Sequence, residues 1–169
     1  MKILLYGNPF LRKKAQKVKK IDKNIETLIE EMFKVMRESN PRGVGLAAIQ
    51  VGVPLSLFVY ELDENDKGVV INPEILLRSG SDVDEEGCLS LPGVYGAVER
   101  AGEIVVRALD MKGRKVEYHL TGLKARVFQH EIDHLRGVVF TDYIDKIDQL
   151  SVDEGFELPE ALLEKFRVR

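Results

Sequence analysis

Three residues in one short segment have the types and the spacing of a metal centre. His130 and His134 are four residues apart, and Glu131 lies between them. Residues four apart on an α-helix lie one above the other, about 6 Å apart along the axis, so both imidazoles can bind one ion. Glu131 points about 100° around the helix, where it can reach a water held by the metal. The segment therefore predicts two metal ligands and a general base on one helix.

A catalytic site of this kind needs a third protein ligand and one position that stays open to water. The chain has one cysteine and three histidines, and no histidine follows His134. Cys88 is the better third ligand, since a thiolate binds such metals strongly. His119, at the end of a strand just before the helix, is expected to face outward or to act as a cap. A non-catalytic protein with a structural metal site is an alternative. Such a closed site needs a fourth protein ligand, and His119 is the only histidine left to supply it.

For each of these residues, the alternative is a purely structural role. A lone cysteine is usually a small buried apolar residue. The two histidines could also be packed helix residues with polar contacts. Burying both of them together with Glu131 would be costly without a function, so the metal centre is favoured.

Periodicity predicts the elements that must position these residues. Apolar residues at steps of three and four predict a helix from Asp22 to Asn40, and a second helix runs from Thr121 to Gly137. The second helix is apolar on more than one side and is therefore expected to be buried. Strands are predicted at 55–62 and 68–77, with a turn at 65–68, and two more flank a turn at Lys112-Gly113. This order favours an α+β fold with antiparallel sheets packed around the buried helix that carries the histidines.

Length and composition indicate one ordinary globular domain. The chain has 169 residues, a net charge of −3 and a 44% hydrophobic content. We expect a single catalytic domain over 1–169, whose tail from 147 to 169 is helical in part after Pro159. The absence of a signal segment and of a membrane-length apolar run predicts a cytoplasmic protein without a membrane partner. The charge balance gives no indication of specific nucleic-acid binding, and the basic run Arg12–Lys23 is interpreted as a solvated surface.

Three stretches together resemble a known family. Gly43–Gln50 (GVGLAAIQ), Glu86–Ser90 (EGCLS) and Gln129–Gly137 (QHEIDHLRG) are similar to the three signature motifs of the peptide deformylases, in the family's order. The resemblance extends from the start of the chain to about Asp145. It implies a metal held by Cys88, His130 and His134. It also implies hydrolysis of the formyl group on the N-terminal methionine of newly made polypeptides, which gives formate and a free amino terminus.

The resemblance also implies roles for further residues. Glu131 matches the catalytic glutamate, and the Gln50 side chain and the Leu89 N–H match groups that bind the carbonyl oxygen. An extended peptide is expected to pair with a strand edge near the glycine-rich motif. The expected substrate-binding residues around it are Val44, Gly45, Arg126 and Val127. Arg126 is expected to touch either the peptide or solvent. Glu86 and Asp133 are candidates for orienting the ligands, and Arg100 for pairing with one of them.

The resemblance implies Fe²⁺ as the ion in the cell, while the donor set also suits Zn²⁺, Co²⁺ and Ni²⁺. The expected partners are N-formyl-methionyl peptides and nascent chains. A transient ribosome contact through Lys165, Arg167 and Arg169 in the tail is a further hypothesis. The alternative function is a metallopeptidase that cleaves internal peptide bonds. It shares the metal and the glutamate but usually takes its third ligand from a downstream His or Glu.

Overall fold

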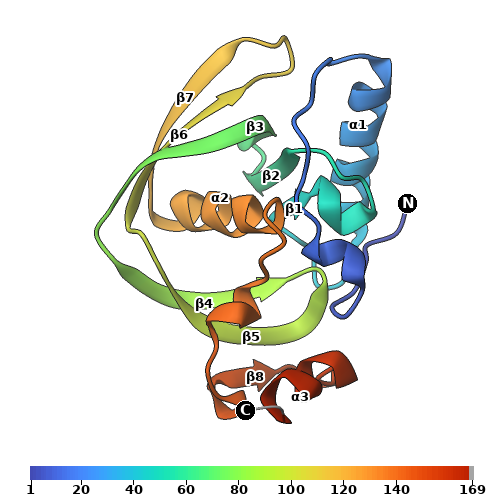
Figure 1. Cartoon of the computed structure of the whole chain (residues 1–169), viewed down its shortest axis with the longest axis vertical. Helices are drawn as coiled ribbons and strands as arrows, with labels where there is room; N and C mark the ends of the chain where they lie inside the picture. The colour runs from blue at the N-terminus through green and yellow to red at the C-terminus, as the bar shows by residue number, and fades with distance from the viewer. Residues whose placement is uncertain (168–169) are drawn as a thin grey trace.

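The computed structural model describes residues 1–167 and places helix α2 between two antiparallel sheets (Figure 1). The five-stranded sheet has the order β1-β2-β3-β6-β7, and the three-stranded sheet has the order β4-β5-β8. This confirms the predicted α+β class. The helices are α1 (Lys23–Glu38), α2 (Gly122–His134) and α3 (Glu160–Arg167), with short 3-10 turns η1 (Pro9–Arg12), η2 (Ala48–Val51), η3 (Phe140–Tyr143) and η4 (Ile147–Gln149). The strands are β1 (Gly45–Ala47), β2 (Leu57–Asp63), β3 (Asp66–Ser79), β4 (Asp82–Cys88), β5 (Leu91–Arg100), β6 (Glu103–Leu109), β7 (Lys115–Thr121) and β8 (Leu150–Val152).

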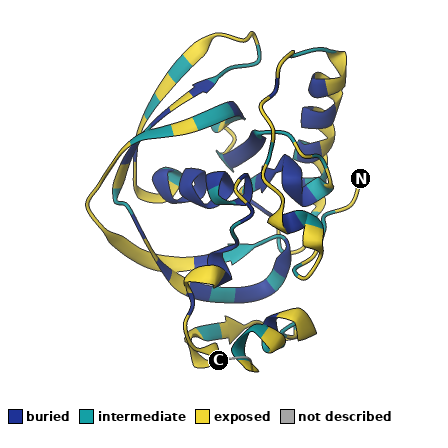
Figure 2. Cartoon of the chain, in the orientation of Figure 1, coloured by how far each residue is buried: buried dark blue, intermediate teal, exposed yellow. Residues whose placement is uncertain are grey.

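Both predicted helices form where the periodicity places them. The Asp22 side chain accepts a hydrogen bond from the Ile25 N–H, as an N-cap does at the start of a helix. α2 ends at His134, three residues before the predicted stop. Gly137 follows with φ +77°, a left-handed conformation that favours glycine. From Ala125 to Ile132 every residue of α2 is buried, and so is His134 (Figure 2).

The hairpin β4–β5 was not predicted. Cys88 is the last residue of β4. The turn between β2 and β3 is at Glu64 and Asn65, earlier than predicted. The glycine-rich motif contributes the short strand β1 and the turn η2. The turn at Lys112-Gly113 between β6 and β7 is confirmed.

The tail is part of the core. Leu162 on α3 is fully buried and belongs to an apolar cluster formed mainly by β5 and the segment after α2. Its partners in that cluster are Leu91, Val94, Val98, Val139, Phe140 and Ile144. The predicted helix after Pro159 is confirmed, and it packs against the sheet that carries Cys88. Within residues 1–167, no helix is long and apolar enough to cross a bilayer.

This packing predicts that Leu162→Ala destabilises the whole domain. Removing a fully buried leucine side chain costs about 2–5 kcal/mol. A matched control is Leu77→Ala, because Leu77 is 66% exposed and its loss should change stability by at most about 0.5 kcal/mol. Thermal unfolding of both variants tests this. Equal melting temperatures for the two variants would show that α3 is not packed as described.

Candidate active site

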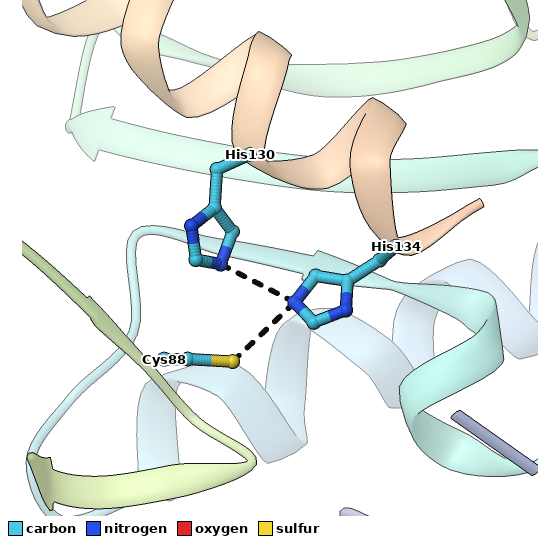
Figure 3. A group of neighbouring side chains, drawn as sticks. All are labelled: Cys88, His130 and His134. Atoms are coloured by element: carbon cyan, nitrogen blue, oxygen red, sulfur yellow. Dashed lines mark hydrogen bonds between the residues drawn. The ribbon is translucent and has the colours of Figure 1, made fainter. Parts of the chain in front are cut away.

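Two elements bring the predicted metal ligands together. α2 supplies His130 and His134, and the end of β4 supplies Cys88 (Figure 3). The Nε2 atoms of the two histidines are 3.2 Å apart, and Cys88 Sγ lies 3.3 Å from His134 Nε2. All three ligand atoms lie within 4.8 Å of one another. The structure therefore places the three predicted ligands around one point.

These separations fit a metal ion. Tetrahedral bonds of the usual length put two imidazole nitrogens about 3.3 Å apart and a nitrogen and a sulfur about 3.6 Å apart. The observed distances are close to both values. A thiolate with two imidazoles is also a donor set that such ions prefer. The residues present therefore fit a bound divalent ion with room for a further ligand.

A buried carboxylate orients the first histidine. Glu86 Oε1 lies 2.8 Å from His130 Nδ1, so Nε2 of that ring is turned toward Cys88 and His134. Glu86 also accepts two hydrogen bonds from Arg100 and one of 2.6 Å from Arg126. A carboxylate that binds the second nitrogen of a ligand imidazole fixes the orientation of the ring. The contact with His130 thus supports the expected orienting role of Glu86.

The network continues away from the metal ligands. Arg100 donates a 2.5 Å hydrogen bond to Asp133 Oδ2, and the Tyr143 hydroxyl donates to the same oxygen at 2.7 Å. The Arg100 guanidinium also stacks on the Tyr143 ring, 5.0 Å from its centre. A chain of contacts therefore runs from η3 through Asp133, Arg100 and Glu86 to the metal ligand His130. Arg100 was expected to pair with one of two acids, and it pairs with both.

Burial and charge set the ionisation of the site. Burial alone raises the pKa of Glu86, but hydrogen bonds from Arg100 and His130 outweigh it and hold this pKa well below its usual range. Burial lowers the pKa of His134, and the charge of His130 lowers it further. Burial also raises the pKa of Glu131 to about 7. A carboxyl group with such a pKa can both accept and donate a proton near neutral pH.

Gln50 lies beside the predicted metal cysteine. Its Oε1 accepts the Ala47 N–H at 2.9 Å, which fixes the amide plane. Its Nε2 is 3.1 Å from Ser90 Oγ and 3.5 Å from Cys88 Sγ. The amide donor is therefore held at the edge of the metal centre. Ser90, which orients it, was not singled out from the sequence.

A cavity of about 220 Å³ opens onto these groups. Glu131 and two of the metal ligands, Cys88 and His130, line it. Glu131 Oε2 has no hydrogen-bond partner among the described residues. The remaining predicted residues that line the cavity are Val44, Gly45, Leu89, Arg126 and Val127. The carboxylate that could move a proton is therefore available to a molecule in this cavity.

Two glycines shape the cavity wall. A Cβ on Gly45 would lie 2.9 Å from Glu131 Oε1, and a Cβ on Gly43 would overlap the Leu89 side chain. A side chain at either position would therefore displace Glu131 or Leu89 from where it lies.

Arg126 lies in the cavity wall but not as expected. Its guanidinium is 5% exposed and is bound to Glu86, to the carbonyls of Val98 and Asp82, and to the Asp82 carboxylate. The expected alternative of a solvent contact is wrong, because the buried Glu86 attracts this cation inward. Contact between Arg126 and a peptide stays a prediction. His119 faces outward as expected and pairs with Glu117.

Comparison with known proteins identifies the family. The family model described as polypeptide deformylase matches residues 1–150. The chain belongs to the polypeptide deformylase family. The peptide deformylase of Dictyoglomus turgidum is 47% identical over 142 residues, 84% of this chain and 91% of that protein. The crystal structure of a Legionella pneumophila peptide deformylase superposes with a TM-score of 0.83 at 43% identity and 88% coverage of both chains.

A third deformylase matches nearly the whole chain. The Synechococcus elongatus structure, in complex with actinonin, covers 98% of this chain and 87% of its own, with a TM-score of 0.82 at 38% identity. The resemblance noted in the three motifs is thereby confirmed. The alternative of a metallopeptidase is not favoured. The closed structural site is not favoured either, since His119 lies outside the ligand group.

The chain of contacts from Tyr143 to His130 predicts that Tyr143 helps to position Arg100 and Glu86. Tyr143 was not singled out from the sequence. Tyr143→Phe removes the hydrogen bond to Asp133 but keeps the ring beside Arg100. We expect metal affinity to fall up to about tenfold, because Arg100 and Glu86 then hold His130 less rigidly. Competition against a chromophoric chelator measures this. Tyr118→Phe is the control, since that ring packs on Phe128 away from the network. Equal affinity in both variants would contradict the positioning role.

Proposed function

We propose that this chain removes the formyl group from the N-terminal formyl-methionine of newly made polypeptides, releasing formate and a free amino terminus. The observation that carries the proposal is the meeting of Cys88, His130 and His134 at one point, beside a cavity that Cys88, His130 and Glu131 line. Membership of the polypeptide deformylase family supports the same reaction.

Cys88, His130 and His134 would hold one divalent ion, with Fe²⁺ as the proposed ion in the cell. When bound, such an ion lowers the pKa of water and polarises a carbonyl oxygen. Zn²⁺, Co²⁺ and Ni²⁺ suit the same donors. Glu86 assists by holding the His130 ring with Nε2 directed into the ligand group.

Glu131 moves the proton in this proposal. Its carboxylate accepts a proton from the attacking water and then returns it to the amine that leaves. Burial supports this role, because it raises the pKa of Glu131 to about 7. The proximity of Gly45 limits where the carboxylate can lie. The group is therefore held at the cavity wall, with one oxygen unengaged.

The negative oxygen that forms on the formyl carbon needs hydrogen-bond donors. The Gln50 amide and the Leu89 N–H are the proposed donors. The position of Gln50 Nε2 next to Cys88 supports this, as does the hydrogen bond that fixes its Oε1. Because the amide is already held in place, it does not have to reorient when the reaction occurs.

An open sheet edge supports the proposed mode of peptide binding. β1 is the first strand of its sheet, so only one of its edges is paired, and Gly45 on β1 lines the cavity. An extended peptide can add to such an edge by main-chain hydrogen bonds. Val44 and Val127 would contact the methionine side chain. Main-chain pairing accepts many sequences, which suits an enzyme acting on varied chain starts.

Gln50→Ala should lower kcat by about 10²–10³ with metal content unchanged, as loss of one oxyanion donor does. Kinetics on a formyl peptide with parallel metal analysis measure both quantities. Ser90→Ala is the matched control, because it removes the neighbour of Gln50 and leaves the amide in place, so a smaller loss is expected. A Gln50→Ala enzyme with near-normal kcat would remove this residue from the proposed role.

The reaction itself is tested with formyl-Met-Ala-Ser and the unblocked Met-Ala-Ser. We expect formate from the first peptide and no cleavage of either chain. Formate can be measured with a coupled dehydrogenase and the peptides by mass spectrometry. Internal cleavage without formate would instead support the metallopeptidase.

The metal is tested on protein prepared without oxygen. If Fe²⁺ is the ion, metal analysis should find iron in near one-to-one amount, and exposure to air should lower activity. Reloading with Ni²⁺ or Zn²⁺ should then give an air-stable enzyme. Zinc in anaerobic protein, with activity insensitive to air, would overturn the choice of iron.

Cytoplasmic localisation and contact with nascent chains are part of the proposal. The tail gives little support for a ribosome contact. Lys165 donates to the carbonyls of Thr141 and Ile144, and Arg167 pairs with Glu160 and Glu164. Arg169, the third residue of that hypothesis, lies outside the described residues.

A further inference from the structure

A buried acid on β2 joins the end of α1 to the connection between α1 and β1, residues 39–44. These three elements pack against one another (Figure 1). The Glu61 side chain is only 8% exposed, and its carboxylate accepts hydrogen bonds from two arginines. Arg37 Nε lies 2.6 Å from Oε2, and Arg42 Nη2 lies 3.0 Å from Oε1. Each oxygen of Glu61 therefore has its own guanidinium partner.

The two arginines differ in what else they contact. Arg37 stacks on the Phe33 ring of its own helix, with the guanidinium carbon 4.9 Å from the ring centre. Arg42 lines the same cavity as Glu131. Across residues 1–167, Glu61 is the only ion-pair partner of Arg42. The position of Arg42 in the cavity wall therefore depends on Glu61, which Arg37 holds from the other side.

The backbone of the α1–β1 connection is held by other bonds. The Gly43 N–H donates to the Met36 carbonyl at 3.2 Å, and the Glu61 N–H donates to the Val44 carbonyl at 2.9 Å. Neither bond involves the Glu61 carboxylate. Removing the charge of that carboxylate would therefore release the Arg42 side chain and leave the course of the chain in place.

The cavity leaves a bound peptide one direction along this segment. Residues 41–45 line the cavity, whereas residues 46–47, further along β1, are fully buried. In the proposed reaction the formyl group must lie beside Glu131, which is close to Gly45. A peptide that starts there and pairs with the edge of β1 therefore runs back toward α1. The residues after its methionine then reach Arg42.

We propose that Glu61 is a positioning residue for substrate binding, because it holds Arg42 where its guanidinium contacts the peptide beyond the formyl-methionine. This rests on the proposed function, since it needs a formyl peptide seated beside Glu131. Arg42 bonds Glu61 through Nη2, and its other N–H groups can donate to main-chain carbonyls of the peptide. An arginine that is already fixed loses less side-chain entropy when the peptide binds.

The proposed contact is remote from the reacting carbon. It is therefore made equally with the bound substrate and with the transition state, so its loss should raise KM more than it lowers kcat. The alternative is that Glu61 only stabilises the fold. Arg37 and Arg42 are 42% and 58% exposed, so both remain solvated when unpaired, and the fold should tolerate the loss of their partner.

The test compares substrates of two lengths, formyl-Met-Ala-Ser and N-formyl-methionine amide, which ends before Arg42. Glu61→Gln removes the charge and keeps the size of the side chain. We expect KM for the tripeptide to rise up to about fivefold, the range of a partly exposed ion pair, with kcat little changed. KM for the amide should stay at the parent value. Arg42→Ala changes an exposed side chain and should give the same length-dependent rise.

The double variant Glu61→Gln/Arg42→Ala shows whether Glu61 acts through Arg42. If it does, the double variant should have the KM of Arg42→Ala alone, because the second change removes nothing more. Asp66→Asn is the matched control. Asp66 accepts a 2.8 Å hydrogen bond from Lys124 in an ion pair between β3 and α2, and neither residue lines the cavity. KM for both substrates should match the parent in this control.

Four results would overturn the positioning role of Glu61. They are an unchanged KM for the tripeptide in Arg42→Ala, equal rises for both substrates, additive effects in the double variant, and a melting temperature that falls in Glu61→Gln while KM stays at the parent value. Failure of the proposed function would look different, since the parent enzyme would then release no formate from either substrate.

Discussion

The buried carboxylate of Glu86 is the interaction on which the site depends. Its two oxygens receive Arg100, Arg126 and the ring of His130. Glu86 is two residues before Cys88 on β4, and the pairing with β5 shifts register between Gly87 and Cys88. The end of one strand therefore supplies both the thiol and the group that orients the imidazole. Removing one partner would leave an uncompensated charge in the interior, which is strongly destabilising.

Helix α2 has an aromatic environment on one side and a polar environment on the other. On one side Phe128 packs against the rings of Phe58, Tyr60 and Tyr118. On the other side His130 and His134 face Cys88. Aromatic packing fixes the helix without using polar groups, and the charge network then fixes the imidazoles. A helix held by only one of these would leave the ligand atoms free to move by more than a metal bond tolerates.

Sequence reasoning could predict α1, α2 and the pairing of His130 with His134, because each depends on local periodicity or short spacing. Cys88 could be predicted beside them because the chain offers few other candidate ligands. The same reasoning could not predict β4, whose acidic residues are typical of a solvated turn. β4 pairs with β5, and its one buried acid, Glu86, is bound by Arg100 and Arg126, which are 14 and 40 residues away in the sequence. Tyr143 was missed for the same reason: its partner Asp133 is close in sequence, but Arg100 completes the contact only in three dimensions.

The glycines at the cavity wall connect the fold to the chemistry. Gly45 is a strand residue on β1, and it is also the position where any Cβ would press on Glu131. In the proposed binding mode, a peptide on the β1 edge would pass close to the Glu131 carboxylate at this backbone position. The absence of a side chain at Gly45 leaves room for that carboxylate. One edge strand would therefore both hold the chain and bring it to the proposed base.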